Sequence, residues 1–228
     1  MDQSPTTDPT TTLDRALPAL VIHTALRREV RLAGPLVRGV AVGDLERATT
    51  VAAHLGVVLR MLHHHHENED ELVWPPLAER AVGEEPGMVA LMQEQHLALE
   101  HCLEQIASTM PRWSRGAGAA ERDELAGALE ALHAILDEHL EAEERMALPM
   151  AERVLTEEEW EAIGRHGEKA AKGREKLLVF GILVYEGDPA TVAQMLSKAP
   201  LPVRTLLPRL ALRRYRRHAA AIYGTPTP

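Results

Sequence analysis

Histidine and glutamate recur at the same spacing in two parts of this chain. Residues 65–75 read HHENEDELVWP, and residues 139–149 read HLEAEERMALP. In each segment a histidine is followed four residues later by a glutamate, giving the pairs His65/Glu69 and His139/Glu143, and a proline follows six residues after the glutamate. Residues four apart share one face of an α-helix, so each pair can bind a metal ion from one side.

A single histidine precedes each pair within a second repeat. HTAL at 23–26 matches HLAL at 96–99, so each half of the chain offers one histidine and, about 42 residues later, a His-x-x-x-Glu motif. Imidazoles and carboxylates without thiolates favour iron or manganese, and zinc is also compatible with them. The repeats predict a metal site with six ligands: His23, His65, Glu69, His96, His139 and Glu143.

The register within the histidine-rich segment is open to alternatives. The same four-residue spacing occurs in His63/Glu67, His66/Asp70, His96/Glu100 and His133/Asp137. Only the His65/Glu69 frame reproduces the Glu-to-Pro spacing of the second segment. His54 lies about three turns before His65 and is either a further ligand, a hydrogen-bond partner of a ligand, or an ordinary buried histidine. The run 63–66 by itself is also compatible with a chelating surface tract, but the agreement between the two halves favours a built site.

The pattern of apolar residues, caps and prolines predicts four long helices that would position these residues. We expect helices over 17–33, ended by Gly34-Pro35; over 44–74, capped by Asp44 and ended by Pro75-Pro76; from about Pro86 to Pro111; and over 119–148, ended by Pro149. Residues 112–118 are expected to form a loop. Four such helices with short connections indicate an all-α, up-and-down four-helix bundle.

The rest of the chain is expected to form a helical extension. Thr156 followed by Glu159 forms a capping box, Asp188-Pro189 starts a short helix to Ala199, and a last helix covers 203–223 with Pro208 near a kink. We therefore predict a disordered arm over 1–14, the bundle over 15–150, and an extension over 151–228 that packs on the bundle.

Composition excludes several classes of protein. The 228 residues are 45% hydrophobic but only 3% aromatic, so Leu, Ala, Val and Met must fill the core. A lone cysteine, Cys102, excludes an internal disulfide framework, and the longest apolar run, Leu177–Tyr185, is too short to cross a bilayer. We expect a soluble, cytoplasmic protein with no membrane partner.

Charge is distributed unevenly along the chain. The net charge is −9, yet no acidic residue follows Asp188, and seven Lys and Arg residues give this end +7. Such an end docks on acidic surface of the same chain or stays solvated more often than it binds nucleic acid. We therefore expect no nucleic-acid partner.

The ordered pattern of the six predicted ligands resembles the hemerythrin-like family, the HHE cation-binding domains, over about residues 15–150. The similarity is greatest to actinobacterial members that carry a C-terminal extension. The resemblance implies two non-haem iron ions, with manganese or zinc as less favoured alternatives. It also implies that Glu69 and Glu143 bridge the ions together with an oxo or hydroxo group.

Two positions depart from the oxygen-carrying hemerythrins. Their third helix carries His-x-x-x-His, whereas Glu100 follows His96 here, and their fourth helix carries an aspartate where this chain has Glu144. Either Glu143 or Glu144 can supply the second bridge, and the internal repeat favours Glu143. The departures point away from reversible oxygen carriage and toward relatives linked with peroxide, nitric oxide or iron handling.

The sequence thus predicts a di-iron protein that binds or reduces a small oxidant: dioxygen, hydrogen peroxide or nitric oxide. The alternative is a non-enzymatic iron or oxygen sensor whose stability depends on its metal. Three further carboxylates are expected to orient the ligand imidazoles: Glu67, Glu100 and Glu141.

Overall fold

The computed structural model describes residues 13–80, 87–167, 171 and 173–228, and every regular element in these ranges is helical. Most of the predicted arm over 1–14 lies outside the described residues, as does Pro86. The elements are α1 (Leu17–Arg38), α2 (Leu45–Leu72), α3 (Trp74–Arg80), α4 (Met88–Gly116), α5 (Ala119–Ala142), the π-helical turn η1 (Glu143–Ala147), α6 (Leu148–Val154), α7 (Glu157–Gly167), α8 (Arg174–Glu186), α9 (Pro189–Met195) and α10 (Leu201–Tyr223).

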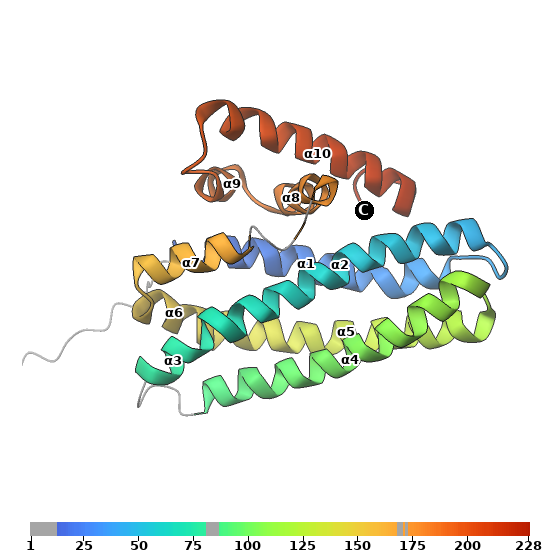
Figure 1. Cartoon of the computed structure of the whole chain (residues 1–228), viewed down its shortest axis with the longest axis horizontal. Coiled ribbons are helices and arrows are strands. Elements are labelled where there is room, and N and C mark those ends of the chain that lie inside the picture. Colours follow the sequence, from blue (N-terminus) through green and yellow to red (C-terminus); the bar gives the residue numbers. More distant parts are fainter. Residues whose placement is uncertain (1–12, 81–86, 168–170, 172) are drawn as a thin grey trace, which may run out of the picture.

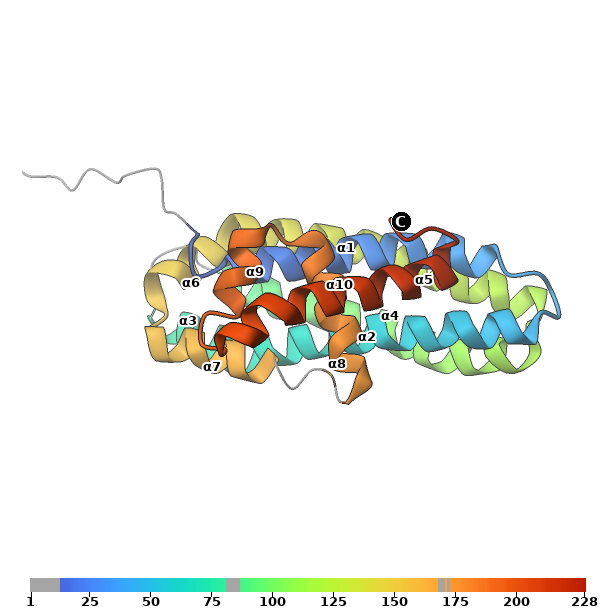
Figure 2. The same ribbon diagram turned by 90° about the horizontal axis from the view of Figure 1, so that it is seen from above.

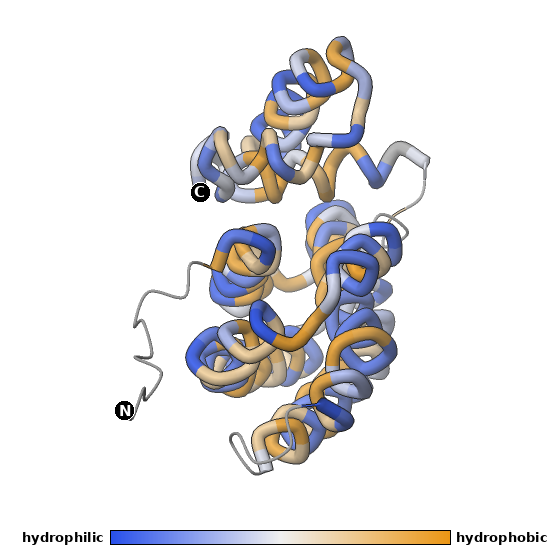
Figure 3. The backbone as a smooth tube through the Cα atoms, turned by 90° about the vertical axis from the view of Figure 1, so that its left-hand side faces the viewer, coloured by the Kyte–Doolittle hydropathy of each residue, from blue (hydrophilic) through white to orange (hydrophobic). Residues whose placement is uncertain are grey.

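Helices α1, α2, α4 and α5 form the predicted up-and-down bundle, which confirms the fold class (Figure 1). Their apolar faces point inward when the bundle is viewed along its axis (Figure 3). The two hairpin loops meet at one end, where the Gly43 amide donates to the Ala117 carbonyl at 3.0 Å. Helices α3, α6 and α7 gather at the opposite end.

Two prolines that were expected to end helices lie inside them instead. Helix α1 continues through Pro35 to Arg38, and α4 continues through Pro111 to Gly116, so the expected loop at 112–118 is mostly helical. In α1 the continuation buries Val37, and in α4 it buries Trp113, both completely. Burial of these side chains outweighs the one backbone hydrogen bond that each proline removes.

The prolines that follow the two His-x-x-x-Glu motifs start new helical segments. Pro75 and Pro76 lie in the first turn of α3, after a break at Val73. Pro149 lies in the first turn of α6, directly after η1. A missing amide hydrogen costs little in a first turn, so the prolines that were expected to end the two helices begin the next helical segments.

The capping predictions are confirmed. Asp44 accepts a hydrogen bond from the Arg47 amide at 3.0 Å, and Thr156 and Glu159 form a reciprocal capping box at the start of α7. The Asp188 side chain caps α9, which ends at Met195, short of Ala199.

Helices α8 and α10 form a layer over α1 and α2 (Figures 1 and 2). The sequence did not predict α8, which lies within the apolar run after the glycines. It packs closely on α10, since a Cβ atom at Gly181 would overlap the Ala211 carbonyl. None of the helices in the described ranges is long and apolar enough to cross a membrane.

A buried polar network joins this layer to the bundle. The Glu29 carboxylate of α1 accepts hydrogen bonds from the hydroxyls of Tyr215, at 3.2 Å, and Tyr223, at 2.6 Å, both on α10. His54 of α2 bonds Tyr223 at 2.7 Å and His218 at 3.0 Å. His54 therefore helps to attach α10. Both of its ring nitrogens face α10, so the suggested role as a metal ligand is wrong.

The basic end of the chain contributes an ion pair with α7, and it comes from Lys198 and not from the described arginines of α10. Lys198 pairs with Glu161, but within the described residues no arginine of α10 forms an ion pair. Apolar contacts, the Glu29 network and the hydrogen bonds that the Arg47 guanidinium donates to the Ala221 and Ile222 carbonyls therefore hold α10 in place.

Candidate metal centre

The antiparallel bundle brings all six predicted residues to one region of its interior. His23 and His96 lie early in α1 and α4, whereas the two His/Glu pairs lie at the ends of α2 and α5. Because neighbouring helices run in opposite directions, these four places are at the same end of the bundle, near α3, α6 and α7. All six side chains are nearly or fully buried.

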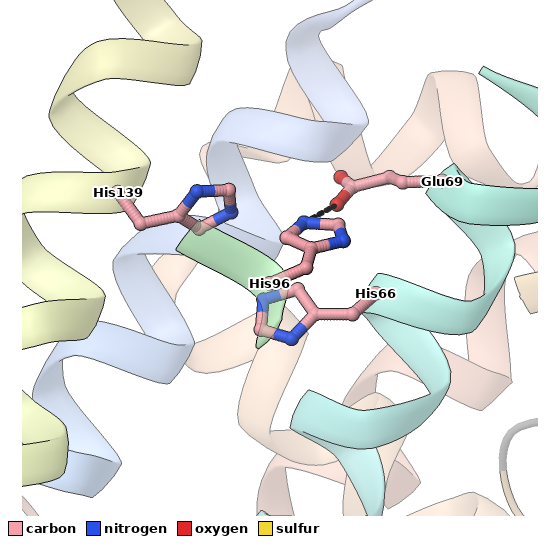
Figure 4. Close-up of side chains that lie close together, drawn as sticks. All are labelled: His66, Glu69, His96 and His139. Carbon is pink, nitrogen blue, oxygen red and sulfur yellow. Dashed lines mark ion pairs between the residues drawn. The ribbon is translucent and has the colours of Figure 1, made fainter. Parts of the chain in front are cut away.

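The donor atoms form two groups that share one residue. The three-histidine group consists of His66, Glu69, His96 and His139 (Figure 4), and the two-glutamate group consists of His23, His65, Glu69 and Glu143. Within each group the donor atoms lie within 4.8 Å of one another. Donors that bind one ion at about 2.1 Å lie at most about 4.2 Å apart, so small side-chain movements would complete either shell.

Both glutamates lie between the two groups. Glu69 Oε1 is 3.2 Å from His65 Nε2, and its Oε2 is 3.5 Å from His96 Nε2. Glu143 Oε2 is 3.3 Å from His23 Nε2 and 3.8 Å from His139 Nε2. Each carboxylate therefore faces one imidazole from each group, which is the placement that a bridging ligand requires.

The unsatisfied hydrogen-bonding atoms of the protein test whether a metal fits here. Seven site atoms are buried without a hydrogen-bond partner: Nε2 of His23, His65, His66, His96 and His139, and Oε2 of Glu69 and Glu143. Buried polar atoms without partners are costly and rare in folded proteins. A pair of cations would satisfy all seven, so the residues fit a two-metal site.

The other ring nitrogen of three imidazoles is held by a neighbouring side chain. His23 Nδ1 lies 2.9 Å from Glu144, His96 Nδ1 lies 2.8 Å from Asp70, and His139 Nδ1 lies 3.2 Å from Gln95. Such contacts place the proton on Nδ1 and leave Nε2 free for a metal.

These contacts agree with the preference for Glu143 as the bridging glutamate and correct the expectation for the carboxylates that orient the imidazoles. Glu144 orients His23 and also accepts from Arg27 Nη1 at 2.6 Å, so Glu143 is the glutamate placed to bridge. The sequence suggested that Glu67, Glu100 and Glu141 orient the imidazoles. Glu67 and Glu100 instead face His63, and Glu141 is exposed.

His66 is the site residue that sequence reasoning missed. Its ring lies 4.4 Å from that of His96 and 5.2 Å from that of His139, between centroids. His66 of α2 supplies the third imidazole of its group, whereas on α4 the position four residues after His96 is a glutamate, Glu100. The sequence did contain a signal for His66. It lies next to His65, and the third helix lacks the second histidine that the oxygen-carrying hemerythrins have there.

Burial sets the protonation of the metal-free site. It lowers the pKa of His139 to about 3, and it holds the pKa values of His65 and His66 well below 6.5, with neighbouring imidazoles adding to the effect. Burial also raises the pKa of Glu143 to about 8, assisted by the charge of Glu69, and raises that of Glu69 well above 4.5. At neutral pH these imidazoles are neutral ligands, and the Glu143 carboxyl keeps its proton until a cation displaces it.

The metal-free protein should therefore lose stability as the pH rises from about 7.5 through about 8, the folded pKa of Glu143. The unfolded-chain pKa of Glu143 is 4.5 and the folded value is about 8, so the folded state holds more protons in this window and stability falls as pH rises. The unfolded histidines still lose protons near pH 6.5 and oppose this trend there, but above about pH 7.5 they are neutral in both states. Thermal midpoints of chelator-treated protein should fall across the window, whereas the metal-loaded protein should show no such fall. A midpoint that rises in the metal-free protein would contradict the assignment.

Replacing His66 by alanine should remove one metal ion and retain the other. The substitution takes a donor from the three-histidine group but leaves all four donors of the two-glutamate group. Metal analysis after desalting should give half of the wild-type content. His133→Ala, a histidine of α5 outside both groups, is the matched control and should retain full content.

Comparison with protein families gives a match to the model for the hemerythrin HHE cation-binding domain over residues 21–168. The chain belongs to this family. The matched range contains all seven residues of the two groups and extends past α5 to include α6 and α7. The hemerythrin domain of this chain therefore includes the end of the bundle where the His/Glu groups lie. Comparisons with curated proteins and with solved structures gave no match.

Proposed function

We propose that this hemerythrin-family protein holds two non-haem iron ions and uses them to bind or reduce a small oxidant: hydrogen peroxide, dioxygen or nitric oxide. The observation that supports this most directly is the convergence of seven unsatisfied buried donor atoms on two groups that share Glu69. Five imidazoles and two carboxylates, with no thiolate, are a donor set that suits iron.

The chain itself would hold the ions and leave positions open. When bound, the iron pair would supply electrons and coordination positions for the oxidant. Each group offers four donors, fewer than the six of an octahedral ion. Glu69 and Glu143 would keep the ions together, while Glu144, Asp70 and Gln95 fix the imidazole rings.

The burial of the site limits what can reach it. His23 and His139 are completely buried, and the apolar cluster of α3, α4 and α6, including Trp74, Met92 and Met150, covers this end of the bundle. Trp74 packs directly against His96, with ring centroids 5.7 Å apart. Such a site favours diatomic or peroxide-sized ligands over larger substrates.

Metal analysis combined with an optical spectrum tests this proposal. Protein loaded anaerobically with ferrous iron and then oxidised should hold two irons per chain and show the charge-transfer absorption of an oxo-bridged pair. It should also consume peroxide, and chelation or zinc loading should stop the turnover. One zinc per chain, or no retained metal, would contradict the proposal.

The same unsatisfied atoms favour a second candidate function, a non-enzymatic iron or oxygen sensor. Without metal the site holds seven costly unpaired atoms, so occupancy should change the stability of the bundle strongly. Iron-dependent stability without peroxide, dioxygen or nitric oxide chemistry would favour this alternative.

A further inference from the structure

A cluster of imidazole and carboxylate side chains lies on the surface beside the buried centre. This surface cluster consists of His63, His64 and Glu67 on α2 and Glu100 on α4. His63 Nε2 is 3.4 Å from Glu67, its Nδ1 is 3.5 Å from Glu100, and His64 Nδ1 is 2.8 Å from Glu67. The cluster thus spans the seam between α2 and α4 with pairs of one imidazole nitrogen and one carboxylate oxygen. Because His63 faces Glu67 with one ring nitrogen and Glu100 with the other, no three of these donors converge on one point as those of the buried groups do.

The surface cluster is one helical turn from the three-histidine group. His63 precedes His66 by three residues, and Glu100 follows His96 by four. Residues at these spacings have Cβ atoms about 5–6 Å apart on a helix. A cation held at the surface cluster would therefore lie next to His66 and His96, the two imidazoles that α2 and α4 contribute to that group (Figure 4).

Exposure of the buried ligands indicates the side from which a cation can enter. His66 and His96 each retain 6% exposure, whereas His23 and His139, on α1 and α5, retain none. His65 of α2 is intermediate in exposure, so the more exposed residues of the centre lie on α2 and α4, the two helices that carry the surface cluster.

We propose that the surface cluster is a metal-loading site, which captures a divalent cation from solvent and passes it to the buried centre. This proposal rests on the proposed function, because it requires a buried centre that retains metal. The exposed donors form an incomplete, hydrated shell, so binding there is weak and exchange is fast. The buried centre offers more imidazoles and two carboxylates, so transfer inward is favourable. The run of four histidines then has two functions: His63 and His64 capture the cation, and His65 and His66 retain it.

Uptake kinetics of cobalt(II) by the metal-free protein test the proposal. Co²⁺ uses the same nitrogen and oxygen donors, and its visible absorption reports entry into the buried centre. The triple variant His63→Ala/Glu67→Gln/Glu100→Gln should fill the centre roughly tenfold more slowly, the lower limit of what local charge contributes to association rates, with unchanged final content. The matched control is His133→Ala/Glu104→Gln, which removes an exposed carboxylate one turn further along α4 and a histidine outside the cluster, and it should load at the wild-type rate.

The outcomes separate the two proposals. Equal rates in wild type and triple variant would overturn the loading role, and so would a lower final content in the triple variant. Wild-type protein that retains no cobalt after desalting would overturn the proposed function and the loading role with it. As a second measurement, Mn²⁺ added to fully loaded protein should broaden the NMR signals of His63 and His64 selectively; broadening no greater than that of His133 would also overturn the proposal.

Discussion

Replacing Glu69 by alanine is expected to remove both metal ions from the protein. Glu69 is the one residue common to the two donor groups, so its loss leaves three donors in each. Metal retained after desalting should fall from two ions per chain toward none, whereas His66→Ala retains one. Glu71→Ala, an exposed glutamate on the same helix that lies 3.5 Å from His166, is the matched control and should retain both. Full metal content in the Glu69 variant would contradict a shared ligand.

Replacing Glu69 by alanine should lower the stability of the protein relative to wild type when metal is present, but not when metal is absent. Loaded wild type gains about 3–4 kcal/mol for each bound ion at metal concentrations 100- to 1,000-fold above the dissociation constant, and the variant should lose this gain. Without metal the variant should be at least as stable as wild type, because it no longer buries the unsatisfied Oε2 atom of Glu69. Denaturant unfolding with and without chelator measures both effects. Equal destabilisation in the two states would indicate a purely structural residue.

Replacing Glu29 by alanine is expected to destabilise the protein by about 3–5 kcal/mol, the usual cost of breaking a buried ion pair from one side. Glu29 is fully buried and lies 2.9 Å from Arg28 as well as bonding both tyrosines of α10. Burial by itself would raise the pKa of Glu29, but His54, Arg28 and Tyr223 hold it below 4.5. The substitution would leave these cationic and hydroxyl groups without their acceptor.

The effect should be concentrated in the C-terminal layer. Hydrogen exchange should accelerate in α8 and α10 more than in α4 and α5, while metal content stays at the wild-type value. Tyr223→Phe removes one hydrogen bond from the same network and should cost about 1 kcal/mol. A Glu29 variant no less stable than the Tyr223 variant would show that the network does not attach α10.

The π-helical turn at Glu143–Ala147 places part of the candidate metal centre in irregular backbone. Such turns insert one residue into a helix and are frequent at functional sites. The turn starts at Glu143, the glutamate that faces both groups. Helix α6 follows it directly and has Pro149 in its first turn. The proline that the sequence repeat marked therefore belongs to the restart of the helix after the site.

The sequence alone determined the features that depend on local spacing. The two His-x-x-x-Glu motifs and the two preceding histidines identified six of the seven residues in the donor groups, because helical periodicity fixes which residues share a face. The same local rules predicted the four long helices and the caps at Asp44, Thr156 and Asp188, since a cap contacts only the next few residues.

Only the tertiary structure decided the features that depend on contacts between distant segments. Four consecutive histidines point in four directions, and packing against α4 and α5 placed His66 inside and left His63 outside. The role of His54 was decided by its hydrogen-bond partners His218 and Tyr223 on α10, which are 164 and 169 residues away in the sequence. The sequence favoured Glu143 but left Glu144 open, and the contacts of Glu144 with His23 and Arg27 of α1 gave Glu144 its separate role. Pro35 and Pro111 stayed within helices because burial of Val37 and Trp113 against other helices outweighed the local loss of a hydrogen bond.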